Sequence, residues 1–123
     1  MVAGRPAYQP DRGHFVFLNF TPHAGSEQGG RLTALILSPL AYNIATGRAF
    51  ACPVTDQVKG SPFEVRVPPG GRLTGVILAD QARNLDWLAR NVEFVSVADR
   101  GTLLEVLARL EAILQIALDP ASS

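Results

Sequence analysis

The hydrophobic period of this chain changes once, near residue 100, and that change limits the folds it can adopt. Leu103, Leu107, Leu110 and Leu114 recur at helical spacing, which is typical of an amphipathic helix. Thr102-Leu103-Leu104-Glu105 has the form of a capping box, and Asp119-Pro120 is a stop signal. We therefore expect a helix of about 15 residues that packs on a sheet. A coiled-coil partner helix is the alternative.

Before that point, short apolar runs alternate with turns rich in glycine and proline. The strands expected on this pattern span residues 14–20, 31–37, 48–54, 63–67, 73–79 and 92–97. Residues 38–47 read as a turn-rich connection, and residues 80–91 as a short helical turn or loop. The pattern predicts a mainly β fold with a C-terminal helix, in which antiparallel strands form a small, partly open barrel. We expect one domain over 1–123, with its core at about 8–118 and short flexible tails.

The charge and cysteine content restrict the function classes. Eleven basic residues balance eleven acidic ones among 123, so any phosphate-binding surface must be local rather than spread over the whole domain. The single cysteine, Cys52, excludes an internal disulfide and a cysteine-based metal cluster, and we expect a buried structural thiol. The chain shows no export signal or membrane span. We therefore expect a cytoplasmic protein.

Five sequence blocks, in order along the chain, carry a family resemblance. The blocks are Tyr8-Gln9-Pro10-Asp11-Arg12-Gly13; Gly25-Ser26-Glu27-Gln28-Gly29-Gly30-Arg31; Leu37-Ser38-Pro39 with Tyr42-Asn43; residues 53–65, which read PVTDQVKGSPFEV; and Ala79-Asp80-Gln81 with Trp87. Together they closely resemble the MazF/PemK toxin family, the toxins of type II toxin-antitoxin systems. The resemblance implies a small SH3-like barrel of the PemK-like or CcdB-like type.

The resemblance also implies an activity and partners. Members of this family are homodimers that bind a cognate MazE-type antitoxin and cut single-stranded RNA, often mRNA, at short sequence motifs. The expected reaction is metal-independent and needs no cofactor. In it, the ribose 2′-hydroxyl attacks the adjacent phosphorus and leaves a 2′,3′-cyclic phosphate and a 5′-hydroxyl.

The expected catalytic residues follow from the same resemblance. The family threonine maps onto Thr55, whose hydroxyl can donate to a phosphoryl oxygen, although a threonine beside Asp56 also stabilises turns. Glu27 is a candidate for orienting an arginine or contacting a base. The family arginine aligns with Leu32, which can neither donate to phosphate nor transfer a proton. Arg31 is adjacent, but neighbouring strand residues face opposite ways, so Arg31 replaces it only if the strand is shifted or bulged by one residue.

The candidate RNA-binding residues share polar side chains in or near the matching blocks: Asn19, His23, Gln28, Gln57, Lys59 and Gln81. His23 is also a candidate acid or base, with a surface histidine as the simpler alternative. Gln81 either reads a base or fastens a buried network, and Lys59 either contacts phosphate or solvates a turn. Trp87 is expected in the core rather than as a stacking platform.

Two functions are therefore compatible with the sequence, and a third has weaker support. The first is a sequence-specific endoribonuclease toxin. The second is a catalytically impaired dimer that binds RNA or antitoxin, because Leu32 stands where the arginine is expected. The third rests on fold-level similarity to toxins that poison DNA gyrase, whereas the loop motifs match the ribonuclease branch.

Overall fold

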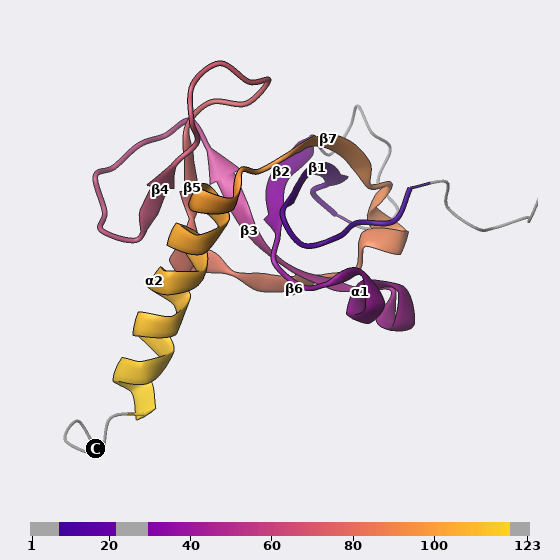
Figure 1. Cartoon of the computed structure of the whole chain (residues 1–123). Helices are drawn as coiled ribbons and strands as arrows, with labels where there is room; N and C mark the ends of the chain where they lie inside the picture. Colours follow the sequence, from indigo (N-terminus) through magenta and orange to yellow (C-terminus); the bar gives the residue numbers. More distant parts are fainter. Residues whose placement is uncertain (1–7, 22–29, 119–123) are drawn as a thin grey trace, which may run out of the picture.

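The computed structural model describes residues 8–21 and 30–118. Its elements, in chain order, are β1 (His14–Asn19), β2 (Arg31–Ile36), α1 (Leu40–Thr46), β3 (Ala49–Thr55), β4 (Glu64–Arg66), β5 (Val76–Leu78), the 3₁₀ turn η1 (Ala79–Gln81), β6 (Arg83–Leu85), the 3₁₀ turn η2 (Trp87–Arg90), β7 (Glu93–Val97) and α2 (Arg100–Leu118). Figure 1 shows the curved sheet with α2 running beside β4 and β5, well apart from α1.

A single antiparallel sheet organises the strands. Its order is β4-β5-β3-β2-β1-β7, and β6 also pairs with β3. The strand β3 therefore pairs with three others, β2, β5 and β6. The sheet has two ends, β4 and β7, so the described strands do not close into a barrel. The predicted fold class, a small antiparallel β structure with a C-terminal helix, is confirmed.

Apolar side chains are buried on both faces of the central strands. Phe15, Leu35 and Cys52 belong to the first core cluster, which also contains Val106 of α2. Their chain neighbours Val16 and Ala34 belong to the second core cluster. Because successive side chains of a strand point to opposite faces, burial on both sides explains why these strands read as continuous apolar runs rather than alternating ones.

Two side chains confirm expectations about the core. Trp87 is buried in the second core cluster, and its indole N–H donates to the carbonyl oxygens of Asn43 (3.1 Å) and Arg48 (3.2 Å). The Cys52 side chain is fully buried within β3. Burial, with a smaller contribution from the charge of Asp80, raises the pKa of the Cys52 thiol to about 12. The thiol is therefore protonated and protected, as a structural cysteine should be.

The expectation of a turn-rich connection after β2 is wrong, because that segment contains the helix α1. The helix is organised by Asn43, whose buried amide donates to the carbonyl oxygens of Pro10 and Ser38, both at 2.9 Å. Gly47 ends it in the left-handed conformation, with φ of +67°, which glycine adopts readily. Seven residues are too few to show a helical hydrophobic period.

The capping of α2 also differs from the prediction. The helix begins at Arg100, two residues before Thr102, and spans 19 residues rather than about 15. Asp99 provides the cap, since its carboxylate accepts hydrogen bonds from the backbone N–H (3.1 Å) and the hydroxyl (2.6 Å) of Thr102. Glu105 instead forms an ion pair with Arg109 at 3.5 Å.

Among the described residues, no helix is long and apolar enough to cross a bilayer.

The later strands are shorter than predicted, and one was missed. The expected strands 63–67 and 73–79 contain three-residue strands, β4 and β5, because residues 67–75 form a loop closed by a hydrogen bond from Val67 N–H to the Gly75 carbonyl oxygen at 2.9 Å. Residues 80–91 do contain helical turns, η1 and η2, but the strand β6 lies between them and pairs with β3. A strand of three residues is too short to show alternation.

Candidate active site

Thr55 is the last residue of β3, where the strand still pairs with Val76 of β5. Its hydroxyl oxygen accepts a hydrogen bond from the backbone N–H of Gln57 at 3.1 Å. This is the local turn that a threonine makes with the backbone two residues ahead. The hydroxyl proton remains available, so Thr55 can accept from its own turn and donate outward at the same time.

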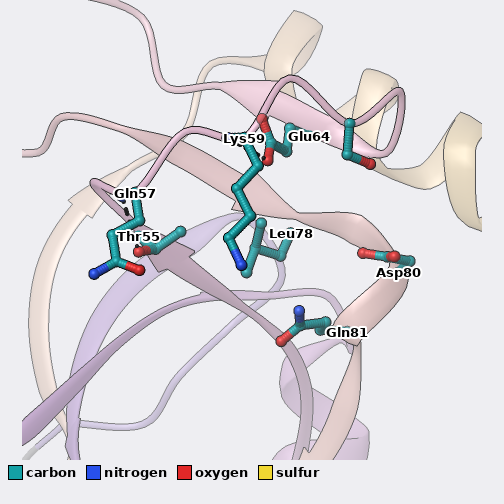
Figure 2. A pocket seen from close by; sticks show the side chains of 8 residues that line it. Thr55, Gln57, Lys59, Glu64, Leu78, Asp80 and Gln81 are labelled. Carbon is teal, nitrogen blue, oxygen red and sulfur yellow. Dashed lines mark hydrogen bonds between the residues drawn. The ribbon is translucent and has the colours of Figure 1, made fainter.

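A polar hollow of about 290 Å³ opens beside Thr55, and we call it the Thr55 hollow. Its lining consists of Thr55, Gln57, Lys59, Ser61, Glu64, Leu78, Asp80 and Gln81. In Figure 2, Thr55 and Gln57 lie on one side, Gln81 and Asp80 lie across from them, and Lys59 extends from its loop toward Leu78. The structure therefore brings four of the expected site residues together.

The loop that carries Lys59 is fixed to β4 by one carboxylate. The two oxygens of Glu64 accept the backbone N–H groups of Lys59 and Gly60, each at 3.0 Å. Gly60 has φ of +81°, a conformation that favours glycine. Both oxygens of Glu64 are thus turned toward the loop backbone. Among the described residues, the Lys59 ammonium has no hydrogen bond or ion pair, so its charge is available to a ligand.

The hollow combines one cation with groups that suit nucleobase edges. The side-chain amides of Gln57 and Gln81 each offer donors and an acceptor. Gln81 is exposed, at the end of η1, so the alternative in which it fastens a buried network is wrong. Asp80 is exposed on the same hollow and adds an acceptor with negative charge. Phosphate contact through Lys59 and base contact through the two amides are both possible here.

Arg31 and Asn19 lie in a different group, which we call the Arg31 cluster. The Arg31 guanidinium donates to Asn19 Oδ1 at 2.7 Å and to the Asn91 carbonyl oxygen at 3.2 Å. It also forms an ion pair with Glu93 at 3.3 Å. These contacts join β2 to β1 and to the start of β7. The structure therefore gives Arg31 a set of internal partners, and Thr55 is not among its hydrogen-bond partners.

The strand that carries Arg31 contains no shift. Arg31 pairs with Asn19 and Leu32 with Leu18 in an unbroken register, so the one-residue bulge that would move Arg31 into the Leu32 position is absent. Leu32 packs against the second core cluster. No guanidinium therefore occupies position 32.

Three other candidate residues, His23, Glu27 and Gln28, lie outside the described residues. The second histidine, His14, is engaged locally, because its Nδ1 lies 2.6 Å from the hydroxyl of Tyr8. Among residues 8–21 and 30–118, no group of three histidine, cysteine or acidic side chains is arranged to hold a metal ion.

Sequence reasoning missed three polar residues that line the Thr55 hollow, Ser61, Glu64 and Asp80, and the apolar Leu78. The alternation of residues 63–67 could have placed Glu64 on the polar face of its strand. Asp80 adjoins Gln81, and its place in a matching block was the signal available. Ser61 gave no signal beyond its position in a turn.

Comparisons with known proteins agree with this architecture. The family model of the PemK-like, MazF-like toxins of type II toxin-antitoxin systems matches residues 11–114. The endoribonuclease toxin MazF of Escherichia coli K12 is 47% identical over 83 residues, which cover 68% of this chain and 74% of that protein. The structure of MazF (Form-I) from Deinococcus radiodurans has a TM-score of 0.78 and 53% identity, and the match covers 87% of this chain and 97% of that one.

A structure of a complex gives a similar match. The MazE-MazF structure (Form-III) from Deinococcus radiodurans aligns with a TM-score of 0.80 and 51% identity over 87% of this chain and 97% of that one. The family match spans most of the chain, and the E. coli relative exceeds 30% identity over two thirds of it. This chain therefore belongs to the PemK-like, MazF-like toxin family of type II toxin-antitoxin systems.

Proposed function

We propose that this protein is the toxin of a type II toxin-antitoxin system and that it cuts single-stranded RNA at the Thr55 hollow. The observation that carries the proposal is the convergence of Thr55 with Gln57, Lys59 and Gln81 on one open, polar surface. Family membership and the endoribonuclease relative support it. The hollow offers a hydroxyl donor, one cation and two amides, which are the groups needed to hold a phosphodiester between readable bases.

In the proposed reaction, the 2′-oxygen forms a bond to phosphorus as the bond from phosphorus to the 5′-oxygen breaks. The 2′-hydroxyl loses its proton to a base, and the leaving 5′-oxygen gains one from an acid. The products are a 2′,3′-cyclic phosphate and a 5′-hydroxyl, and the scheme uses no metal ion. Thr55 donates to a phosphoryl oxygen as charge builds there, and Lys59 holds the neighbouring backbone. His23 is the candidate for a proton transfer, and Glu27 is the candidate for orienting an arginine or contacting a base edge.

We further propose that the toxin is a homodimer that binds a MazE-type antitoxin. The support is the family match and the MazE-MazF complexes among its structural relatives. Light scattering of the purified toxin, alone and mixed with the antitoxin, measures both states. A toxin that stays monomeric and unbound would contradict this part of the proposal.

The second candidate function is a dimer that binds RNA or antitoxin without cutting. The observation that favours it is the absence of an arginine at position 32 together with the internal bonding of Arg31. A protein of this kind retains the hollow but lacks a guanidinium at the phosphate.

The deciding experiment is incubation of a long, unstructured RNA with purified protein in EDTA, followed by mapping of both fragment ends. We expect recurrent cuts at one short motif with cyclic phosphate ends. Thr55→Ala should slow cleavage by about 100-fold, as expected for the loss of one donor to the developing charge, and Thr55→Ser should restore most of the rate. Thr46→Ala, on α1, is the matched control. Binding without cleavage by the folded wild type would favour the second candidate.

A further inference from the structure

A second hollow adjoins Thr55, and an arginine borders it. This hollow, of about 140 Å³, is lined by Thr33, Val54, Thr55, Asp56, Arg72, Leu73 and Thr74. We propose that Arg72 contacts the RNA phosphate that Thr55 binds, and so supplies the guanidinium that position 32 lacks. The inference rests on the proposed function and assigns a further residue to the same site. Arg72 lies in the loop of residues 67–75, outside the sequence blocks that carry the family resemblance.

The base of this loop is fixed directly against Thr55. Gly75 has φ of +103°, and a Cβ there would lie 2.2 Å from the Thr55 carbonyl oxygen. The Thr74 hydroxyl donates to Asp56 Oδ1 at 2.7 Å. These two contacts hold the loop against the end of β3. Thr74 and Gly75, which make them, follow Arg72 by two and three residues. The position of Arg72 relative to Thr55 is therefore built into the fold.

The charge of Arg72 is not used inside the protein. Its side chain is exposed, and within residues 8–21 and 30–118 it has no hydrogen bond or ion pair. Arg31, Arg90 and Arg109 are instead bonded to carboxylates and carbonyl oxygens. A guanidinium presents a planar fork of donors that matches two phosphate oxygens, so an unpaired one beside a threonine hydroxyl suits a phosphodiester.

Two carboxylates near Arg72 are already engaged. Asp56, in the same hollow, accepts the Thr74 hydroxyl. Arg72 also borders a hollow that includes Asp99, but the Asp99 carboxylate is taken up by the N–H and hydroxyl of Thr102. The negative charge of Asp56 opposes an anionic ligand, and Arg72 is the group that offsets it there.

The test compares Arg72→Ala and Arg72→Lys with the matched control Arg83→Ala. Arg83 is also exposed and has no partner among the described residues, but it pairs with Ala51, four residues before Thr55 on β3, or roughly 13 Å along the strand. Single-turnover cleavage should fall about 100-fold in Arg72→Ala, as when one donor to the developing charge is removed. Arg72→Lys should be intermediate, because it keeps the charge and loses the fork. Arg83→Ala should stay within about twofold of wild type.

Binding of an uncleavable RNA, 2′-O-methylated at the cut ribose, provides a second readout. The slope of log affinity against log salt should become shallower by about 0.7 in Arg72→Ala, the value for one lost phosphate contact on a single strand. A neutral methylphosphonate at the cut linkage should weaken binding by wild type more than binding by Arg72→Ala, which retains only the Thr55 contact to that phosphate. Melting temperatures should match, because Arg72 makes no hydrogen bond or ion pair with any other described residue.

The outcomes separate this inference from the proposed function. If wild type cuts RNA and Arg72→Ala behaves as Arg83→Ala does in rate and salt slope, the inference is overturned and the function stands. If wild type binds without cutting, the proposed function fails, and a salt slope altered only by Arg72→Ala still supports the phosphate contact. If wild type binds no RNA, both are overturned.

Discussion

The Thr55 hollow and the Arg31 cluster contain similar side chains in opposite situations. Each lies at strand ends and combines a cation, an amide and a carboxylate. In the Arg31 cluster the guanidinium is bonded to Asn19, Asn91 and Glu93. In the Thr55 hollow, the ammonium of Lys59 has no partner among the described residues, and the exposed Gln81 faces the same space. The polar groups of the Arg31 cluster join strands to one another, whereas those of the Thr55 hollow are open to a ligand.

The difference shows that proximity to a family motif does not by itself assign a role. A ligand gains binding energy from groups that would otherwise contact water, whereas groups already paired must first break their bonds. Arg31 adjoins the expected catalytic position in sequence, yet its bonding assigns it to the stability of the β1-β2-β7 region.

Arg31→Ala should give the largest change, and the change should be in stability. Loss of the charge-assisted contacts is expected to lower the free energy of unfolding by about 1.5–3 kcal/mol. Cleavage per folded molecule should remain within about threefold of wild type, because Arg31 is expected to make no substrate contact. Denaturant unfolding and single-turnover cleavage measure the two, with Arg83→Ala as control. A large loss of cleavage rate with unchanged stability would instead assign Arg31 to the reaction and not to the stability of the fold.

Lys59→Ala should show the converse pattern. We expect about tenfold weaker RNA binding, or about 1.4 kcal/mol, with a salt slope shallower by about 0.7 and little change in melting temperature. Lys59→Arg should retain the slope. Fluorescence anisotropy across a salt series measures it. Equal slopes for Lys59→Ala and wild type would remove Lys59 from the phosphate contacts.

Gln81→Ala should have a smaller effect that depends on RNA sequence. Loss of one amide that bonds a base edge is expected to cost about 1 kcal/mol. The loss should appear at one base of the cut motif and leave the salt slope unchanged. Sequencing the cleavage products of a randomised RNA measures this. A uniform loss across all sequences would instead indicate a backbone contact.

The smallest effect concerns Asp86, which lies outside the Thr55 hollow and forms an ion pair with Arg90. Burial is the largest single influence on the pKa of Asp86 and raises it. The hydrogen bond and charge of Arg90, whose Nε lies 2.5 Å from Asp86 Oδ1, a backbone hydrogen bond and the charge of Arg48 together lower it by more, so the net pKa is below the usual 3.8. A depressed folded-state pKa adds stability that is present above the unfolded pKa and is lost as pH falls through the folded value.

Asp86→Asn should therefore lower the melting temperature by a few degrees near pH 7, corresponding to about 0.5 kcal/mol. The difference from wild type should shrink below about pH 4, near the unfolded aspartate pKa. Thermal melts at several pH values measure it. A difference that persists unchanged at pH 2 would show that the ion pair is not its source.

The sequence predicted what depends on long apolar runs and on contiguous motifs. The central strands are long enough to stand out as apolar runs, α2 is long enough to show its helical period, and Trp87 sits among apolar neighbours. Thr55, Gln57 and Lys59 lie within one block, so their proximity was foreseeable. The helix α1 and the strand β6 were missed because each is too short to show a period. Their stability comes from tertiary contacts, such as those of the buried Asn43.

The partners of Arg31 could not be foreseen for a different reason. Asn91 and Glu93 lie about 60 residues further along the chain, and nothing local indicates that β7 folds beside β1. Likewise, Arg72 reaches the vicinity of Thr55 only because β5 pairs with β3. Both assignments depend on strand order, which motif comparison does not supply.

The position of Cys52 has a practical consequence for following this protein in solution. The only thiol of the chain lies three residues before Thr55, on the strand that pairs with three others, and it is fully buried and protonated. Alkylating reagents can modify it only when β3 detaches. The rate of Cys52 alkylation, measured by mass spectrometry, therefore reports how often the strand that carries Thr55 opens locally. A bound RNA or protein partner that holds this strand in place should lower that rate, and the measurement needs no introduced probe.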